Sequence, residues 1–252
     1  MALTLLALAC ACSTLRAQDY KVTVDNTKDA KLTLENFPGD LPVEGYAGNE
    51  IVLSGSGDFT TPERAKGLKP VYAGGSDNTG VAVAADKDGN KITLRCLLPI
   101  TQNGTYKLRV PENIALKVIR ECSRNGDVTI SNMKSEIEVK NCGSVTLKKV
   151  SGPLVISTIS GPINVVFTDI SKDKPINLAA ISGDIDVTLP AKAAVDLEMS
   201  AISGNMYTDF DLSTDKQDMH RVGGGTIHST LNGGGTELKI HVVSSNIYLR
   251  KG

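Results

Sequence analysis

Residues 143–189 decide the fold, and they read GSVTLKKVSGPLVISTISGPINVVFTDISKDKPINLAAISGDIDVTL. Aliphatic and polar residues alternate here in short runs, and most runs follow a Gly or a Ser-Gly pair. Alternation at period two is the pattern of a β-strand with one buried face. The predicted inward pairs, in this stretch and just before it, are Val128 and Ile130, Ile137 and Val139, Val145 and Leu147, Leu154 and Ile156, Ile163 and Val165, and Ile185 and Val187. The predicted outward residues between them are Thr129, Glu138, Thr146, Asn164 and Asp186.

The turns between these runs also repeat. Gly143, Gly152 and Gly161 are nine residues apart, and Gly183 and Gly204 follow after 22 and 21 residues. A unit of about 20 residues cannot bury its apolar face alone and must stack on its neighbours. This predicts an all-β solenoid of short parallel strands, with Gly supplying positive φ at the corners. An antiparallel β-sandwich is the alternative that strand spacing leaves open.

The rest of the chain follows the same pattern less regularly. Residues 31–35 and 49–54 have the strand pattern, whereas residues 60–90 are looser and predict an excursion from the stack. Asp86–Asn90 predicts a hairpin turn before a strand at 91–94. No shift in composition marks a linker, so we predict one domain over residues 18–252.

Composition narrows the function classes. The formal net charge is −1, from 27 basic and 28 acidic residues, which gives no electrostatic footprint for nucleic acid. No segment after residue 17 is apolar enough for a transmembrane helix. Trp is absent and Tyr numbers only 6, which argues against an aromatic platform for sugars.

The N-terminus has the pattern of a signal peptide. Residues 1–12 form an apolar run of the length of a signal-peptide core, and Ala17 precedes a plausible cleavage point at Gln18. We therefore predict a leader over residues 1–17 and export to periplasm, cell surface or medium. Lipid attachment at Cys10 or Cys12 is an alternative.

Removal of the leader would leave Cys96, Cys122 and Cys142, enough for one disulfide. Cys122 and Cys142 lie about one repeat apart, and residues one coil apart stack within disulfide range. An oxidising exterior would permit this bridge. Two buried thiols are the alternative.

No other residue set predicts a catalytic, cofactor or metal site. The carboxylates Asp184, Asp186, Asp196 and Glu198 could bind Ca²⁺ or act as an acid–base pair, but we favour a solvated sheet face as their explanation. The histidines are His220, His228 and His241, and their spacing is not that of a metal site. The triplets Gly223–Gly225 and Gly233–Gly235 predict tight corners, because no Lys-Ser/Thr follows them.

Several segments resemble a known family. They are AKLTLENFPGDLPVEGYAGNEIVLSG (30–55), GLKPVYAGG (67–75), YKLRVPENIALKV (106–118), the Ser-Gly strand repeats, and the closing run 225–251 with its glycine triplet and NIYLRK. Together they are similar to the bacterial β-strand-repeat proteins known as the putative-adhesin family, a domain of unknown function. The resemblance implies export, a right-handed β-helix-like fold and a role in adhesion or the cell envelope. It brings no catalytic residues.

Three functions remain open at this point. The first is a non-catalytic envelope module that binds an unknown macromolecule, either protein or envelope glycan. The second is a carbohydrate-active β-helix enzyme. The third is a homophilic assembly protein whose solenoid ends pair, because exposed edges of the terminal coils favour strand pairing.

Overall fold

The computed structural model describes residues 18–56, 63–68, 71–72, 74–124, 126–171, 174–212 and 224–252. These residues form strands and one short 3-10 helix, η1 (Glu63–Ala65). The strands are β1 (Gln18–Thr23), β2 (Lys31–Glu35), β3 (Leu41–Tyr46), β4 (Glu50–Ser56), β5 (Val83–Asp88), β6 (Lys91–Cys96), β7 (Thr105–Pro111), β8 (Ala115–Ile119), β9 (Val128–Ser131), β10 (Ile137–Asn141), β11 (Val145–Val150), β12 (Leu154–Thr158), β13 (Ile163–Phe167), β14 (Ile176–Ala180), β15 (Ile185–Leu189), β16 (Val195–Ala201), β17 (Met206–Thr208), β18 (Gly225–Leu231), β19 (Thr236–Val242) and β20 (Ile247–Lys251).

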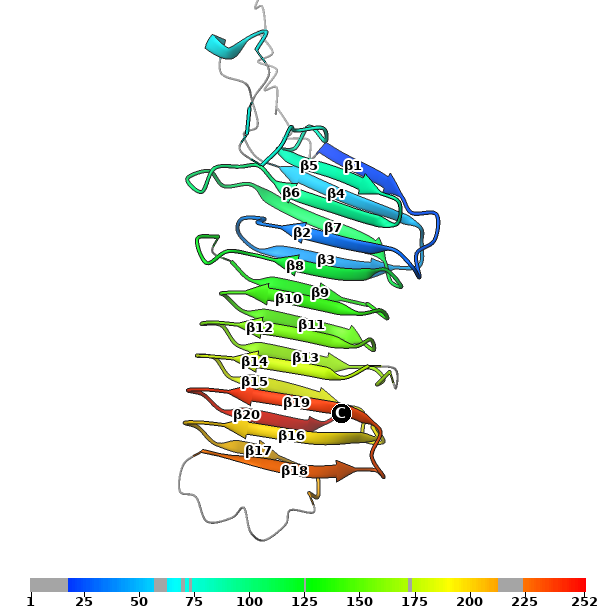
Figure 1. The fold of residues 1–252 in the computed structure, drawn as a ribbon, viewed down its shortest axis with the longest axis vertical. Coiled ribbons are helices and arrows are strands. Elements are labelled where there is room, and N and C mark those ends of the chain that lie inside the picture. Colours follow the sequence, from blue (N-terminus) through cyan, green and yellow to red (C-terminus); the bar gives the residue numbers. More distant parts are fainter. Residues whose placement is uncertain are drawn as a thin grey trace, which may run out of the picture.

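The strands form two long sheets that face each other across a narrow core (Figure 1). From β8 to β15 the chain alternates between the sheets, so that each coil gives one strand to each sheet. Neighbouring coils pair in parallel, for example β9 with β11 and β11 with β13. The predicted all-β solenoid is therefore confirmed, and the antiparallel sandwich is wrong for this part of the chain.

The register gives the length of a coil. Val128, Val145, Ile163 and Ile185 stack as direct partners, so successive coils take 17, 18 and 22 residues. The longest of these coils contains residues 168–175, which connect β13 to β14. The inward residues predicted from the alternation are all buried, so period two correctly assigned the two faces of these strands.

At both ends one coil lies out of sequence order. The coil β2–β3 lies between β6–β7 and β8–β9, and the coil β19–β20 lies between β14–β15 and β16–β17. At each end, therefore, one coil is inserted between two coils that are not its neighbours in the sequence. The label for the C-terminus consequently falls inside the stack in Figure 1, well above its lower end.

Antiparallel pairing finishes both sheets at the N-terminal end and one of the two sheets at the C-terminal end, where the other sheet ends in β17, parallel to β20. At the N-terminal end β1 pairs with β4, β4 pairs with β7, and β5 pairs with β6 as the hairpin predicted around Gly89. At the C-terminal end β18 pairs with β16. The edge strands are thus β1 and β17 in one sheet, and β5 and β18 in the other.

The core is continuous but changes in character along the stack. It is mostly aliphatic in the middle, where Phe167 on β13 is an aromatic member, and it holds the edge-to-face pair of Phe37 and Tyr106 near the N-terminal end, with ring centroids 5.0 Å apart. Burial of this apolar surface is the main force that holds the two sheets together.

One expectation about glycine is wrong. Gly161 and Gly183 in the Ser-Gly turns do not have positive φ. These positions require glycine because the backbone of each turn packs directly against the backbone of the next turn. A Cβ on Gly183 would collide with the carbonyl of Gly161. The triplet Gly233–Gly235 does have positive φ and forms the predicted tight corner between β18 and β19.

Some predictions fall outside the described residues. The leader 1–17, the lipidation candidates Cys10 and Cys12, His220 and Gly223 all belong to this group. The division into a leader and a domain over 18–252 therefore stays a prediction. In the described ranges, no helix has the length and hydropathy to cross a bilayer.

Candidate binding surface

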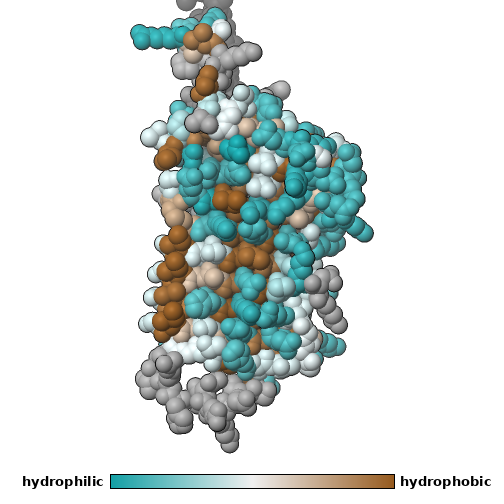
Figure 2. Space-filling model, in the orientation of Figure 1, coloured by the Kyte–Doolittle hydropathy of each residue, from teal (hydrophilic) through white to brown (hydrophobic). Residues whose placement is uncertain are grey.

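An exposed aliphatic column runs along one edge of the solenoid. It comprises one residue from each of four stacked turns, and we call it the apolar ridge: Ile159, Ile181, Val243 and Ile202, in stacking order. The three isoleucines are 44%, 52% and 62% exposed. Figure 2 shows a hydrophobic column at the edge where Figure 1 places these turns.

Backbone hydrogen bonds hold the ridge in line. The amide of Ser182 donates to the carbonyl of Ile159 at 2.9 Å, that of Ser244 to Ile181 at 3.0 Å, and that of Ser203 to Val243 at 2.8 Å. Because each turn is bonded to the next, the ridge side chains repeat at the strand spacing of ~4.8 Å. A straight, rigid apolar edge of this kind loses little entropy when it is covered by a partner.

The same turn column contains the predicted cysteine pair. Cys122 follows β8 and Cys142 follows β10, one coil apart, and the structure joins their sulfurs with a Cα–Cα distance of 5.2 Å. The amide of Ser160 then donates to the carbonyl of Cys142 at 3.0 Å, which continues the column toward Ile159. Formation of the bond in the cell also needs an oxidising compartment, and so it stays a prediction.

A buried arginine supports this corner. The guanidinium of Arg120 donates to the carbonyls of Gly39 at 2.7 Å and of Gly126 and Arg124 at 3.2 Å. Burial lowers the pKa of Arg120, and the nearby carboxylates of Asp40 and Asp127 act in the opposite direction. Arg120 thus ties the turn that carries Cys122 to the turn between β2 and β3, and its role is structural.

The candidate carboxylates do not converge. Asp184 and Asp186 belong to the sheet that contains β15, whereas Asp196 and Glu198 lie on β16 in the opposite sheet. Asp186 forms an ion pair with Arg250 at 2.9 Å, and an oxygen of Glu198 lies 3.9 Å from Lys239. Asp184 and Asp196 accept backbone amides of Asn246 and Gly235 respectively. Each of these carboxylates thus interacts with a residue of a neighbouring strand or turn of the solenoid.

The remaining candidates are also separate. His228 and His241 lie on β18 and β19, in one sheet but without a third ligand. Across the described residues, no three His, Cys, Asp or Glu side chains gather as they would around a metal ion.

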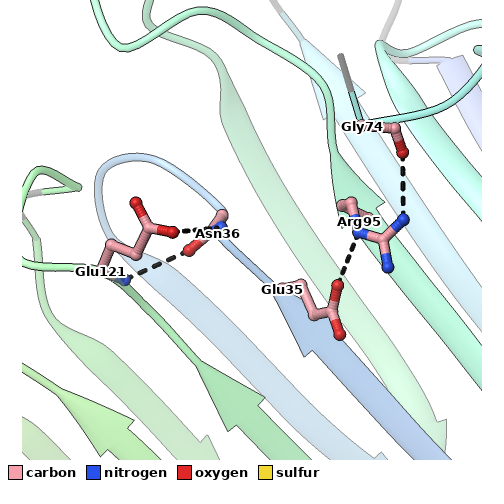
Figure 3. A network of polar contacts seen from close by, with 5 residues as sticks. All are labelled: Glu35, Asn36, Gly74, Arg95 and Glu121. Carbon is pink, nitrogen blue, oxygen red and sulfur yellow. Dashed lines mark hydrogen bonds and ion pairs between the residues drawn. The ribbon is translucent and has the colours of Figure 1, made fainter. Parts of the chain in front are cut away.

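Near the N-terminal end, polar contacts fix the inserted strand β2 on both sides (Figure 3). Arg95 on β6 donates to Glu35 at 2.6 Å and to the carbonyl of Gly74 at 3.0 Å. On the other side of β2, Asn36 accepts the amide of Glu121 at 3.2 Å. These contacts join the inserted coil to the segment before β5 and to the end of β8.

The C-terminal end has an aromatic surface instead. Tyr207 and Tyr248 stack with centroids 5.3 Å apart, and Arg250 lies over the Tyr248 ring at 5.6 Å. A hollow of about 190 Å³ lies beside them, lined by Tyr207, Thr208, Asp209, Tyr248, Leu249 and Arg250. This is a shallow surface feature of the last coils.

The sequence reasoning missed the apolar ridge. Its signal was present, because Ile159, Ile181 and Ile202 each precede a Ser-Gly pair, at the same place in the repeat. The Ser-Gly pair marks each turn, but alternation at period two applies to strands and assigns no face to the residue that begins a turn.

The fold and its surfaces define a class: a two-sheet β-solenoid of mostly parallel strands with an exposed aliphatic edge. Residues 78–250 match the family model described as Toastrack DUF4097, and the chain therefore belongs to this family. The match confirms the family resemblance predicted from the sequence.

Two solved structures are similar over almost the whole chain. One, a "putative cell adhesion protein" from Clostridium sporogenes ATCC 15579, is 12% identical, with a TM-score of 0.47 over 94% of this chain and 100% of that one. The other, a "putative adhesin" from Bacteroides fragilis NCTC 9343, is 13% identical, with a TM-score of 0.39 over 95% of this chain and 98% of that one. No curated protein matches the chain.

Proposed function

We propose that this protein is an exported, non-catalytic, adhesin-like module of the cell envelope that binds a protein partner along its apolar ridge. The observation that carries the proposal is the ridge itself, in which three isoleucines at equivalent turns are 44–62% exposed in one line. Exposed apolar surface that is contiguous, rather than scattered, marks interaction sites. An aliphatic edge without aromatic rings suits a protein surface better than a sugar.

Export is the second part of the proposal. The sequence pattern of residues 1–17 supports it, as does the pair Cys122–Cys142, because disulfides persist in oxidising compartments. The proposal includes cleavage before Gln18, with residues 18–252 as the mature domain.

Intact mass of the protein recovered from cell fractions of its native host tests export. A chain that begins at Gln18, found in periplasm or medium, is the expected result. A chain that begins at Cys10 or Cys12 with added acyl groups, found in membranes, would replace soluble export with a lipid tether. An uncleaved chain in the cytoplasm would overturn this part of the proposal.

Binding is tested with the triple variant Ile159→Lys, Ile181→Lys and Ile202→Lys on beads incubated with envelope protein fractions of the host. We expect retention of a discrete partner by the wild type and at least tenfold less by the variant. The matched control is Val155→Lys with Val166→Lys, since both valines are 42% exposed on strand faces away from the ridge. Equal retention by wild type and ridge variant would overturn the role of the ridge.

A further inference from the structure

The C-terminal end of the solenoid exposes a long edge strand without fixed charge. β18 reads GTIHSTL, and it pairs with β16 over its whole length of 7 residues. No other described strand lies on its outer side. Residues 213–223, which precede it, lie outside the described residues, so the edge is described here for residues 225–231 alone.

The other long edges carry charges. β1 contains Asp19 and Lys21, and β5 contains Asp86, Lys87 and Asp88. Charged side chains on an edge strand oppose pairing with another strand, and natural sheets use them for this purpose. β17, the fourth edge, has only 3 residues. β18 is thus the one long described edge without this protection.

We propose that β18 pairs antiparallel with β18 of a second copy of this chain about a twofold axis, and so joins two solenoids end to end. A twofold axis places the same surface on both partners, so a charge near the centre of the strand would lie close to the same charge on the second copy. An edge that pairs with itself should therefore lack Lys, Arg, Asp and Glu, as β18 does. A different protein partner would gain from complementary charges, which this strand does not offer.

The side chains fit this register. Pairing centred on His228 places Thr226 opposite Thr230 of the second copy on the outer face, and Ile227 opposite Ser229 on the inner face. Cross-strand threonine pairs stabilise antiparallel sheets. His228 meets its own copy at the axis, while Glu198 on β16 is its partner across the existing sheet.

Further apolar surface lies on the same end coil. Ile202, in the turn after β16, is 62% exposed, and Tyr207 on β17 is 51% exposed. Both adjoin the end that the second copy would cover. The pairing uses a different surface from most of the ridge, so the two proposals can fail separately.

The test is the molar mass of the full mature chain by light scattering and sedimentation across a wide concentration range. We expect a concentration-dependent dimer. The variant Thr226→Lys with His228→Lys should weaken it by about tenfold or more, because like charges then face each other. The matched control is Val155→Lys with Ser157→Lys on β12, where both positions are exposed at the same spacing in the same sheet. Circular dichroism melts establish that each variant is folded.

A crosslink measures the register directly. In a Cys96→Ala background, His228→Cys should form an intermolecular disulfide under mild oxidation, because directly opposite Cβ atoms lie about 4.5–5.5 Å apart. Ser157→Cys should not. A wild type that stays monomeric at every concentration, a dimer that survives Thr226→Lys with His228→Lys, or a His228→Cys variant that does not crosslink would each overturn the proposal. Equal partner retention by the wild type and the ridge variant, with an intact dimer, would count only against the proposed function.

Discussion

The two ends of the solenoid differ in how they cover the apolar core and in which edge strands they expose. Each end places one coil out of sequence order, and antiparallel pairing finishes both sheets at the N-terminal end but only the β18 sheet at the C-terminal end. The N-terminal end adds a buried aromatic pair, polar ties on both sides of β2, and charged edge strands. The C-terminal end has a three-residue edge, exposed Tyr207 and an uncharged edge strand.

This difference separates a cap from an interface. A terminal coil must cover its apolar face and oppose edge pairing with strands of other molecules, and the N-terminal end does both. The C-terminal end covers its core but leaves its edge able to pair. The distinction depends on the edge strands themselves, because β1 and β5 carry charged side chains and β18 carries none.

The largest expected effect comes from deleting residues 236–252. Without β19 and β20 a slot opens between β14–β15 and β16–β17, and Leu238, Ile240, Val242, Ile247 and Leu249 leave the core. Losses of about 2–5 kcal/mol for each large side chain exceed a typical total stability of about 5–15 kcal/mol. We expect no cooperative thermal transition by circular dichroism.

Deletion of residues 18–23 is the counterpart at the other end. β1 is an edge strand with exposed Asp19 and Lys21, so its loss should leave a cooperative transition at a somewhat lower melting temperature. If both deletions behaved alike, the slot-filling coil would have no special importance and the comparison of the ends would fail.

The next effect concerns the turn column, in which we predict a disulfide between two turns on the N-terminal side, whereas backbone hydrogen bonds alone join the turns of the ridge. Cys122 and Cys142 are 20 residues apart, and closing such a loop stabilises by about 3 kcal/mol. Reductant should therefore lower the melting temperature by roughly 6–12 °C. Cys96→Ala should show the same drop, and a melt insensitive to reductant would show that the bond is not formed.

A smaller effect separates two arginines. Arg95 is 38% exposed and bonds both Glu35 and the Gly74 carbonyl, whereas Arg250 is 55% exposed and pairs with Asp186. Arg95→Met should destabilise by about 1 kcal/mol, and Arg250→Met should change the melt little, because solvent screens exposed pairs. Urea unfolding measures the free energy of unfolding of both variants. A larger loss of stability from Arg250→Met than from Arg95→Met would contradict the prediction that polar contacts stabilise the N-terminal end more.

The smallest effect is a pH dependence from the N-terminal core. Burial raises the pKa of Tyr106 and of the Cys96 thiol above their ordinary values of 10.0 and 9.0. The unfolded chain therefore releases these protons first as pH rises. This stabilisation is complete below about pH 9 and declines above it. Melting temperatures should fall less steeply above this pH in Tyr106→Phe than in wild type, and equal slopes would contradict this assignment.

Much of the central stack could be predicted from sequence. Alternation identified the inward residues from Val128 to Val187, and the roughly 20-residue repeat implied stacked coils, because side-chain direction has a period of two. The spacing of Cys122 and Cys142 correctly placed them one coil apart.

The coil order and the ridge could not be predicted in the same way. Strands such as Ile163–Phe167 and Ile247–Lys251 present similar alternating faces, so the pattern does not say which coil lies beside which. Their order is set by packing between residues distant in sequence. A single Ser-Gly turn predicts positive φ for its glycine, whereas the close contact of Gly183 with the coil of Gly161 arises only when the coils stack.

The positions of the chain ends give the molecule a direction. Residue 18 starts an edge strand at the N-terminal end, whereas the amide of Gly252 donates to the Leu189 carbonyl at 2.8 Å at the end of β20, one strand in from the C-terminal edge of its sheet. Anything attached before residue 18 would hold the solenoid at its capped end. Ten strands at ~4.8 Å would then carry β18 about 43 Å away from that attachment. A fusion after residue 252 would project sideways instead, and would leave the far tip unobstructed.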